Sequence, residues 1–351
     1  MIARGFHGCC RIQSTETALA GLRLGSPTAY IRIFAVGTAA STHDTREFFE
    51  GICCPLCTSP DYLVLEPARY PVSMDQQQLK QIFRAASDHV LWDQVVRCRV
   101  CDLVYVNPRL RADLILEGYS EAEDPVFAAP NEARIRGFRK TLEGVVKRLG
   151  ISPEGKRVLD VGCAGGAFLV AAREFGFGVT GIEPARWMAA YGRENYQLDI
   201  RDGILEAGVF EEGSFDVITL WDVIEHLPQP LETLEIVRSL LKPGGVLLVN
   251  YPDIGTLAAR TLGRRWPFWL SVHLIYYTRK TMTEQLRRVG FSTLWFESFW
   301  PVLPLGYVAQ RAAPYGKPLE LLRSSIDALG IGKLFLTYNM GQTLAVAKST
   351  Q

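Results

Sequence analysis

The chain has 351 residues, enough for one large domain and a second, smaller one, because single hydrophobic cores rarely grow beyond about 250 to 300 residues. Its 38 Lys and Arg and 37 Asp and Glu give a net charge of +1, which excludes the strong basic bias that by itself indicates a nucleic-acid partner. The hydrophobic content of 48% excludes a disordered chain. No uninterrupted apolar stretch is long enough to span a membrane, so we expect a soluble protein.

The first 46 residues are predicted to form a flexible N-terminal extension. They are rich in Ser, Thr, Gly and Ala, contain no acidic residue before Glu16, and include the basic residues Arg4, Arg11, Arg23 and Arg32. A basic, acid-poor stretch followed by the apolar IRIFAVGTAA is also typical of a signal or transit segment, which is the alternative. The basic region is longer than that of an ordinary signal peptide, which favours the extension.

Two C-x-x-C pairs follow, separated by 40 residues, and their members are Cys54, Cys57, Cys98 and Cys101. Four thiolates in two such pairs complete the tetrahedral coordination of Zn²⁺, so the sequence predicts a structural zinc site in a zinc-ribbon-like module over residues 47–112. Thiolates that stay reduced indicate a cytoplasmic protein. Coincidental cysteines and an iron centre are the alternatives, and Cys53 could replace Cys54 as a ligand.

Residues 113–351 are predicted to form the main domain. Apolar residues recur at three- and four-residue steps between Ile135 and Leu149, which predicts a helix within residues 113–150. Short apolar, β-branched segments then predict strands over 158–162, 179–183, 215–221 and 245–251. The segments between them predict helices over 168–175, 186–195 and 231–241. This alternation predicts an α/β fold with a doubly wound parallel sheet. Two more helices, over 283–289 and 318–329, and closing strand material over 334–349 are expected to complete the domain.

A turn of small residues follows the first of these strands. Gly162 to Gly166 lead from VLDVG into a helix, and such residues let the backbone bend sharply with a ligand against it. Glu183 ends the next strand 21 positions after Gly162, at the spacing at which a carboxylate reaches the two hydroxyls of a ribose. Together they predict a nucleoside-containing ligand. The turn lacks the complete G-x-G-x-x-G typical of dinucleotide oxidoreductases.

Four motifs occur in a characteristic order: VLDVGCAGG, GIEP, FDVITLWDVIEHL and LKPGG. Together they closely resemble class I S-adenosylmethionine-dependent methyltransferases, over roughly residues 132–299. The resemblance implies a Rossmann-like methyltransferase fold with seven mostly parallel strands and S-adenosylmethionine as cofactor. The residues it places at the cofactor are Asp160, Gly162, Cys163, Ala164, Gly165, Gly166, Glu183, Asp202, Trp221 and Asp222.

The resemblance gives some of these residues particular roles, and one of them differs from the residue that is usual in the family. Glu183 is expected at the ribose, and Asp202 is expected near the adenine. Ala164 stands where the family usually has Gly, and Ala is the next smallest residue. Cys163 is interpreted as a small packing residue rather than a nucleophile.

Polar side chains after the strand at 215–221 are candidates for the chemistry. Methyl transfer to a hydroxyl requires donor and acceptor to be aligned and the proton of the hydroxyl to be removed, for which a histidine is suited. His226 and His273 are the two candidate bases. Structural roles are the alternatives: Glu225 and His226 could position the loop before Pro228, and His273 lies among residues typical of a core.

The segment 253–278 is an insertion that, in the family, forms part of the acceptor pocket; the alternative is a surface lid. It carries Arg264, Arg265, Trp266, Phe268 and Trp269. The cysteine module followed by LVYVNPRL resembles the zinc-binding segment of methyltransferases that modify glycans, sugar nucleotides or secondary metabolites. We therefore expect methylation of a hydroxyl or amine of a small molecule or of a glycan or sugar-nucleotide precursor.

Two other functions remain as alternatives. An RNA methyltransferase could use the zinc module to bind RNA, with phosphate contacts from Arg97, Arg99, Arg109 and Arg111. A non-catalytic scaffold could keep the cofactor fold and use the module to bind a protein partner. Neither the acceptor atom nor the oligomeric state is predicted by the sequence.

Overall fold

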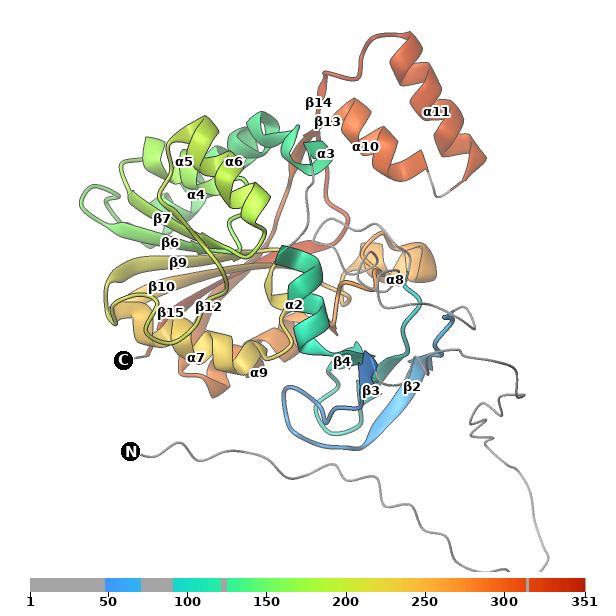
Figure 1. The fold of residues 1–351 in the computed structure, drawn as a ribbon, viewed down its shortest axis with the longest axis horizontal. Helices are drawn as coiled ribbons and strands as arrows, with labels where there is room; N and C mark the ends of the chain where they lie inside the picture. The colour runs from blue at the N-terminus through green and yellow to red at the C-terminus, as the bar shows by residue number, and fades with distance from the viewer. Residues whose placement is uncertain (1–47, 71–90, 121–124, 314–315, 351) are drawn as a thin grey trace, which may run out of the picture.

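The computed structural model describes residues 48–70, 91–120, 125–313 and 316–350, so the predicted extension over 1–46 lies outside the described residues (Figure 1). Its centre is a seven-stranded mixed sheet with the strand order β12-β15-β10-β9-β6-β7-β8. The strands are β6 (Arg157–Val161), β7 (Gly178–Glu183), β8 (Ile200–Asp202), β9 (Phe215–Trp221), β10 (Leu241–Pro252), β12 (Phe291–Ser298) and β15 (Gln342–Ser349).

Strands β10, β9, β6, β7 and β8 pair in parallel, whereas β15 is antiparallel to both of its neighbours, β10 and β12. The central strands are apolar and buried on both faces, as expected for parallel strands that are covered by helices. The structure confirms the predicted doubly wound sheet, in which the order of strands reverses between β6 and β9. Ligands of such folds bind beyond the carboxyl ends of the strands at this reversal.

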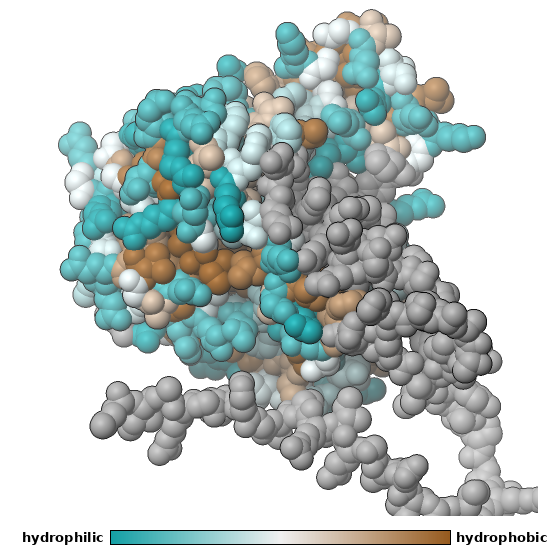
Figure 2. All heavy atoms as spheres, viewed as in Figure 1, coloured by the Kyte–Doolittle hydropathy of each residue, from teal (hydrophilic) through white to brown (hydrophobic). Residues whose placement is uncertain are grey.

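Helices cover the sheet on two sides (Figure 1). One layer consists of α4 (Asn131–Leu149), α5 (Ala167–Glu174) and α6 (Arg186–Tyr196), and the other of α7 (Pro230–Leu240) and α9 (Arg279–Arg288). The predicted helical segment 113–150 is divided into α2 (Ala112–Ser120), α3 (Pro125–Ala128) and α4. Figure 2 shows a hydrophobic band between the two helical layers, flanked by hydrophilic side chains. No helix among the described residues has the length and apolar character needed to cross a membrane.

A second, four-stranded sheet lies beside α2 and α8 (Leu257–Leu262) (Figure 1). Its strands, in the order β11-β4-β3-β2, are β11 (Ile275–Tyr276), β4 (Val104–Val106), β3 (Val95–Cys98) and β2 (Tyr62–Glu66). A short pair, β1 (Phe49–Glu50) and β5 (Arg109–Leu110), accompanies it. Strand β11 belongs to the predicted insertion 253–278, so the cysteine module and the insertion share one sheet.

The C-terminal part differs from the single closing segment predicted over 334–349. Strand β14 (Phe335–Thr337) pairs with β13 (Val302–Pro304), and only β15 enters the main sheet. Helices α10 (Leu305–Ala312) and α11 (Lys317–Ala328) come between β13 and β14 in the chain. Both helices project from the rest of the domain (Figure 1). The short helices η2 (Ile224–His226) and η3 (Gly263–Arg265) complete the fold.

Candidate active site and cysteine cluster

A large open cavity lies beyond the carboxyl ends of β6, β7 and β9, where the fold predicts a ligand site. Its volume is about 1480 Å³. Most small-molecule sites measure about 300 to 1,000 Å³, so this cavity has room for two ligands. It is lined by the glycine turn and Glu183, and also by η2, the insertion and the C-terminal segment.

The glycine turn presents its backbone to the cavity. Gly162 and Ala164 have φ values of 68° and 46°, and both line the cavity together with Cys163 and Gly165. A side chain other than hydrogen is strained in this left-handed region, so the Ala at position 164 is tolerated at a cost of about 1 kcal/mol. Gly166 does not line the cavity. Its φ is 77°, and an added Cβ would lie 2.2 Å from Leu198, so Gly166 is needed for packing behind the turn.

Glu183 is held rigidly at the end of β7. Its Oε2 accepts a hydrogen bond from the backbone N–H of Ala164 at 2.7 Å, and its Oε1 accepts one from that of Ala185 at 2.9 Å. The residue is 6% exposed and lines the cavity, so its remaining lone pairs are available to hydroxyl donors of a ligand. Burial raises the pKa of Glu183 to about 7, and the two backbone donors oppose this shift.

Asp160 lies beside Glu183, at the end of β6. It is buried, and its Oδ1 accepts a hydrogen bond from Thr219 at 2.6 Å. Burial raises the pKa of Asp160 to about 8, opposed by the hydrogen bond from Thr219 and reinforced by the charge of Glu183. The cavity wall therefore contains two neighbouring carboxyl groups, and the charge of Glu183 affects the pKa of Asp160.

Asp202 was predicted to lie near the adenine, but it lies outside the cavity wall. Its carboxylate pairs with Arg193 at 2.8 Å and does not line the cavity, whereas the following residues Gly203 and Leu205 do. The reason is its position at the end of the edge strand β8, where α6 supplies a cation. Backbone and apolar side chains, rather than the Asp202 carboxylate, thus face the space beside Glu183.

The other predicted cofactor residues line the cavity. Trp221 packs in an aromatic cluster against Phe138, Phe168 and Phe299, and its Nε1 has no hydrogen-bond partner in the described part of the chain. Asp222 accepts hydrogen bonds from Asn250 at 2.7 Å and Gln342 at 2.9 Å. Burial raises the pKa of the Cys163 thiol far above its ordinary value, as expected for a packing residue and not for a nucleophile.

The two candidate bases lie next to each other, although 46 residues separate them in the chain. The rings of His226 and His273 have centroids 4.8 Å apart, and both side chains line the cavity with Glu225. The potential ligand atoms of the three residues all lie within 4.8 Å of one another. We call these three residues the polar cluster.

Hydrogen bonds fix both imidazoles. Nδ1 of His226 lies 2.9 Å from the carbonyl oxygen of Val272 and 2.7 Å from the hydroxyl of Tyr119, and Nδ1 of His273 lies 2.8 Å from the carbonyl oxygen of Phe268. Because a carbonyl oxygen only accepts, each Nδ1 carries the proton and each Nε2 keeps its lone pair. Burial lowers the pKa of His226 to about 4 and that of His273 well below its ordinary value, so both rings are neutral at pH 7.

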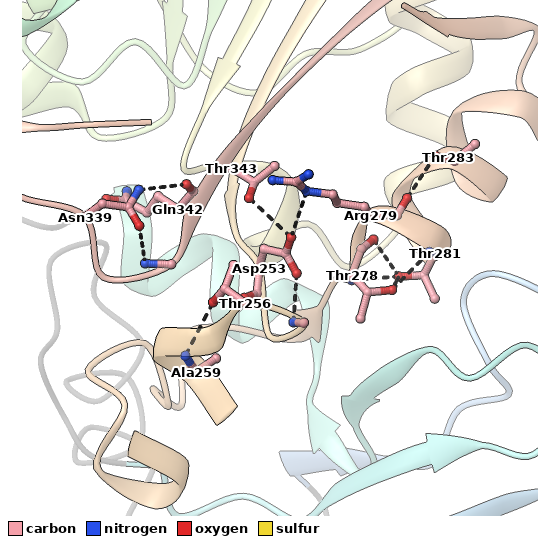
Figure 3. A network of polar contacts seen from close by, with 12 residues as sticks. Asp253, Thr256, Ala259, Thr278, Arg279, Thr281, Thr283, Asn339, Gln342 and Thr343 are labelled. Atoms are coloured by element: carbon pink, nitrogen blue, oxygen red, sulfur yellow. Dashed lines mark hydrogen bonds and ion pairs between the residues drawn. The ribbon is translucent and has the colours of Figure 1, made fainter. Parts of the chain in front are cut away.

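Both ends of the insertion are anchored to the main sheet (Figure 3). Asp253, directly after β10, accepts hydrogen bonds from the backbone of Gly255 at 2.7 Å and from Thr343 at 3.2 Å, and it faces Arg279 at 3.7 Å. Thr278 caps α9. Between these anchors, the insertion contacts the active site. The backbone N–H of Leu274 donates a hydrogen bond to the carbonyl oxygen of Glu225 at 2.8 Å.

The four predicted zinc ligands come together at one end of the second sheet. The Sγ atoms of Cys54 and Cys101 are 3.5 Å apart, those of Cys57 and Cys98 are 3.4 Å apart, and all four lie within 4.8 Å of one another. In each pair the first cysteine carbonyl accepts a hydrogen bond from the residue after the second cysteine. Zn–S bonds of about 2.3 Å place tetrahedral sulfurs at a similar spacing, so the donor set fits a structural zinc ion. Cys53 is not part of this group.

Sequence patterns gave no indication that three further residues, one of them considered only as a phosphate contact, would lie around the cavity. Arg134 and Tyr119 come from the helices α4 and α2 and line the cavity, and Arg109 is buried behind it. Arg109 donates to the carbonyl oxygen of Pro228 at 2.7 Å and pairs with Glu50 at 2.9 Å. It therefore ties the module to the loop that follows the polar cluster.

Comparisons with known proteins identify the domain that contains this cavity. Residues 133–294 match the family model described as "Methyltransferase domain". The ubiquinone biosynthesis O-methyltransferase of Xanthomonas campestris pv. campestris (strain B100) is 37% identical over 102 residues, covering 27% of this chain and 43% of the relative. That of Actinobacillus pleuropneumoniae serotype 5b (strain L20) is 40% identical over 106 residues, covering 27% and 45%. The chain thus spans less than half the length of these curated relatives.

Solved structures with a similar fold include two methyltransferases. A possible histamine N-methyltransferase from Thermotoga maritima has a TM-score of 0.41 and 18% identity, covering 63% of this chain and 91% of the other. An S-adenosylmethionine-dependent methyltransferase from Archaeoglobus fulgidus has a TM-score of 0.43 and 19% identity, covering 64% of this chain and 100% of the other. The family match and the curated relatives confirm the prediction of a methyltransferase at the level of the domain.

Proposed function

We propose that this chain, which carries a methyltransferase domain over residues 133–294, transfers the methyl group of S-adenosylmethionine to a hydroxyl group of a small, largely apolar molecule. The observation that carries the proposal is a single cavity with two unlike ends. One end has the rigid Glu183 carboxylate beside a turn of small residues, and the other has an apolar wall and the polar cluster.

The Glu183 end fits a nucleoside with a charged tail. The carboxylate accepts hydrogen bonds from the two ribose hydroxyls, and the turn at Gly162–Gly165 leaves space for the methionine part. Gly203 and Leu205 provide backbone and apolar contacts for the adenine. S-adenosylmethionine supplies a methyl group that is already activated on a sulfonium, so the main task of these residues is to hold it aligned and away from water.

The opposite end fits an apolar acceptor better than a glycan. Besides Arg265 and His273, its wall from the insertion consists of Leu262, Pro267, Phe268, Leu270 and Val272, and its wall from the C-terminal segment includes Val302, Leu303, Val308, Leu319 and Leu336. A glycan needs many hydrogen-bonding groups in its site, whereas these side chains bury an apolar ring or chain. The O-methyltransferase names of the curated relatives support a hydroxyl as the accepting group.

The polar cluster provides candidate acceptors for the proton of that hydroxyl. His226 and His273 are neutral at pH 7, and each has a lone pair on Nε2, so each has the form that a proton acceptor requires. Their position next to Glu225 explains why two histidines so distant in the chain belong to one site. A purely structural role would not explain why all three of these polar side chains line the cavity.

For the cysteine cluster we propose one structural Zn²⁺ that supports the active site. Strand β11 pairs with β4 of the module and begins two residues after His273, so the module holds the segment that carries this residue. Binding of RNA by the module is disfavoured, because three of the four arginines considered as phosphate contacts, Arg97, Arg99, Arg109 and Arg111, already have acidic partners. These pairs are Arg109 with Glu50, Arg111 with Asp113 and Arg99 with Asp61.

The test is methyl transfer from labelled S-adenosylmethionine to panels of phenols and aliphatic alcohols, sugar nucleotides, and RNA. We expect label in the apolar hydroxyl compounds and little in the other two panels. His226→Ala should lower kcat by about 10²- to 10⁴-fold, the usual contribution of acid–base groups, while cofactor affinity stays unchanged. Label found in sugar nucleotides or RNA alone would contradict the proposed acceptor.

Cofactor affinity is expected to rise with pH up to about pH 7. The ribose hydroxyls donate to the ionised Glu183, whose pKa burial raises to about 7, so binding below that pH releases a proton. Between about pH 5 and 7 the affinity should increase by up to tenfold per pH unit and then level off. Without ligand, the same raised pKa lowers fold stability as the pH rises from about 4.5 to 7, because the folded protein holds a proton that the unfolded chain releases.

Calorimetry in two buffers with different ionisation enthalpies measures that proton release directly. The Asp202→Asn protein is the control, since its altered carboxylate lies outside the cavity and should leave the profile unchanged. A flat affinity profile between pH 5 and 7, with no proton released, would show that Glu183 does not receive the ribose.

A further inference from the structure

Glu225 is a buried carboxylate without a hydrogen-bond partner among the described residues. It is 1% exposed, and neither Oε1 nor Oε2 is hydrogen-bonded. A carboxylate that is removed from water in this way is costly unless a cation or several donors compensate it. Proteins therefore rarely keep such a group in a cavity wall without a ligand that completes it.

The two imidazoles beside it are arranged as donors of electron pairs. Nδ1 of His226 and Nδ1 of His273 are both committed to backbone carbonyl oxygens, of Val272 and Phe268, which leaves Nε2 of each ring unprotonated. Histidines that bind metals almost always donate their other ring N–H to a carbonyl or carboxylate in this way, which fixes the tautomer and the ring orientation. Neither Nε2 has a hydrogen-bond partner in the ranges that the structure describes.

The three groups already lie close together before any ligand is bound. Their potential ligand atoms lie within 4.8 Å of one another, and the two rings are inclined at 76°. The backbone hydrogen bond from Leu274 to Glu225 joins the segments that carry them. Metal bonds of about 2.0 to 2.2 Å to His and Glu require the atoms to approach by roughly 1 Å more, which side-chain rotation can provide.

We propose that Glu225, His226 and His273 bind one divalent first-row transition-metal ion, such as Zn²⁺ or Fe²⁺, at the acceptor end of the cavity. Two imidazole nitrogens and one carboxylate oxygen suit these ions, whereas Mg²⁺ and Ca²⁺ prefer oxygen ligands alone. Three protein ligands leave a coordination position open towards the cavity.

The open position gives this metal a role in the proposed function, on which this part of the inference rests. With the metal bound, both Nε2 atoms would be ligands, so neither imidazole would accept the proton of the acceptor. The hydroxyl oxygen would occupy the open position instead, where the metal would lower the hydroxyl pKa and the proton would pass to solvent. Acceptors with an acidic hydroxyl, such as phenols, fit this arrangement best.

The experiment counts metal in the full chain. Protein dialysed against Zn²⁺ and then against metal-free buffer is analysed for zinc per chain, for the wild type and for His273→Gln and Glu225→Gln. The wild type should hold one equivalent more than either variant. Cys53→Ser is the matched control, because Cys53 lies outside both clusters, and it should hold as much zinc as the wild type.

Substitution with Co²⁺ provides a second measurement, which the wild type alone can already answer. Thiolate-bound Co²⁺ shows intense charge-transfer absorption, whereas Co²⁺ bound by nitrogen and oxygen shows only weak d–d bands. The wild type should show both signals, and loss of His273 should remove only the weak one. Equal zinc content in the wild type and both variants, with no nitrogen–oxygen cobalt signal, would overturn the metal site.

Failure of the metal site is distinguishable from failure of the proposed function. If methyl transfer proceeds at full rate in protein that lacks the second equivalent, the metal has no part in the reaction, while the proposed function stands. If the protein does not bind S-adenosylmethionine, the proposed function is wrong whatever the zinc count.

Discussion

Replacing Glu183 by glutamine is expected to weaken S-adenosylmethionine binding by about 10²- to 10⁴-fold. Hydrogen bonds from two ribose hydroxyls to a charged group contribute about 1.5 to 3 kcal/mol each, and 1.4 kcal/mol corresponds to a factor of ten in affinity. Glutamine also places an amide N–H₂ where the carboxylate accepts from the backbone N–H of Ala164 or Ala185, so one donor always faces another. Isothermal calorimetry with the cofactor and its demethylated product measures the loss.

The control for this substitution is Asp202→Asn. Asp202 ends the neighbouring strand but pairs with Arg193 outside the cavity, so its replacement should change the affinity by less than about threefold, a difference of under 1 kcal/mol. Equal affinity of the Glu183→Gln protein and the wild type would mean that the nucleoside does not lie at the end of β7. That result would also contradict the proposed methyl transfer.

Replacing Cys98 by serine is expected to remove one equivalent of zinc and to disrupt the cysteine module. Cys98 is fully buried, and its Sγ lies 3.4 Å from that of Cys57 within the four-sulfur group. A structural zinc ion contributes more than about 10 kcal/mol to the folding of small zinc domains, because its thiolate ligands are otherwise left unsatisfied. We expect the melting temperature to fall by about 10 °C or more, since each kcal/mol corresponds to about 2 to 4 °C in a domain of 150 to 250 residues.

The disruption should extend to the active site. Strand β11 is held by β4 of the module, and Arg109 joins the module to Pro228, so methyl transfer should fall together with the melting temperature. Metal analysis and calorimetric melting of Cys98→Ser and of the control Cys53→Ser check this. A Cys98→Ser protein that loses metal but keeps its melting temperature and activity would show that the zinc is not structural.

The predicted strands and the glycine turn were accessible from the sequence because their signals are local. Strands buried on both faces are continuous apolar runs, and a tight strand-to-helix turn needs small residues such as Gly162. Glu183 was identifiable because the length of one strand–helix–strand unit fixes its distance from the turn along the chain. The pairing of cysteines in two C-x-x-C motifs is likewise a matter of spacing.

The composition of the polar cluster was not accessible in this way. Glu225 and His226 follow β9, but His273 comes from an insertion whose path depends on Asp253 at one anchor and on pairing of β11 with the module. Both histidines were candidates from the sequence, yet only as rivals for one role. Tertiary structure makes them neighbours, and it leaves the Glu225 carboxylate without a hydrogen-bond partner among the described residues.

The sequence by itself thus determined the parallel core, the small-residue turn with its acidic residue, and the four cysteines, because each depends on residue type and short-range spacing. Tertiary structure alone decided that Asp202 turns to Arg193 and that Arg109 is buried against Glu50. It also decided that the module completes a sheet with the segment carrying His273. These outcomes depend on which distant surfaces pack together, and no local pattern in a single chain records that choice.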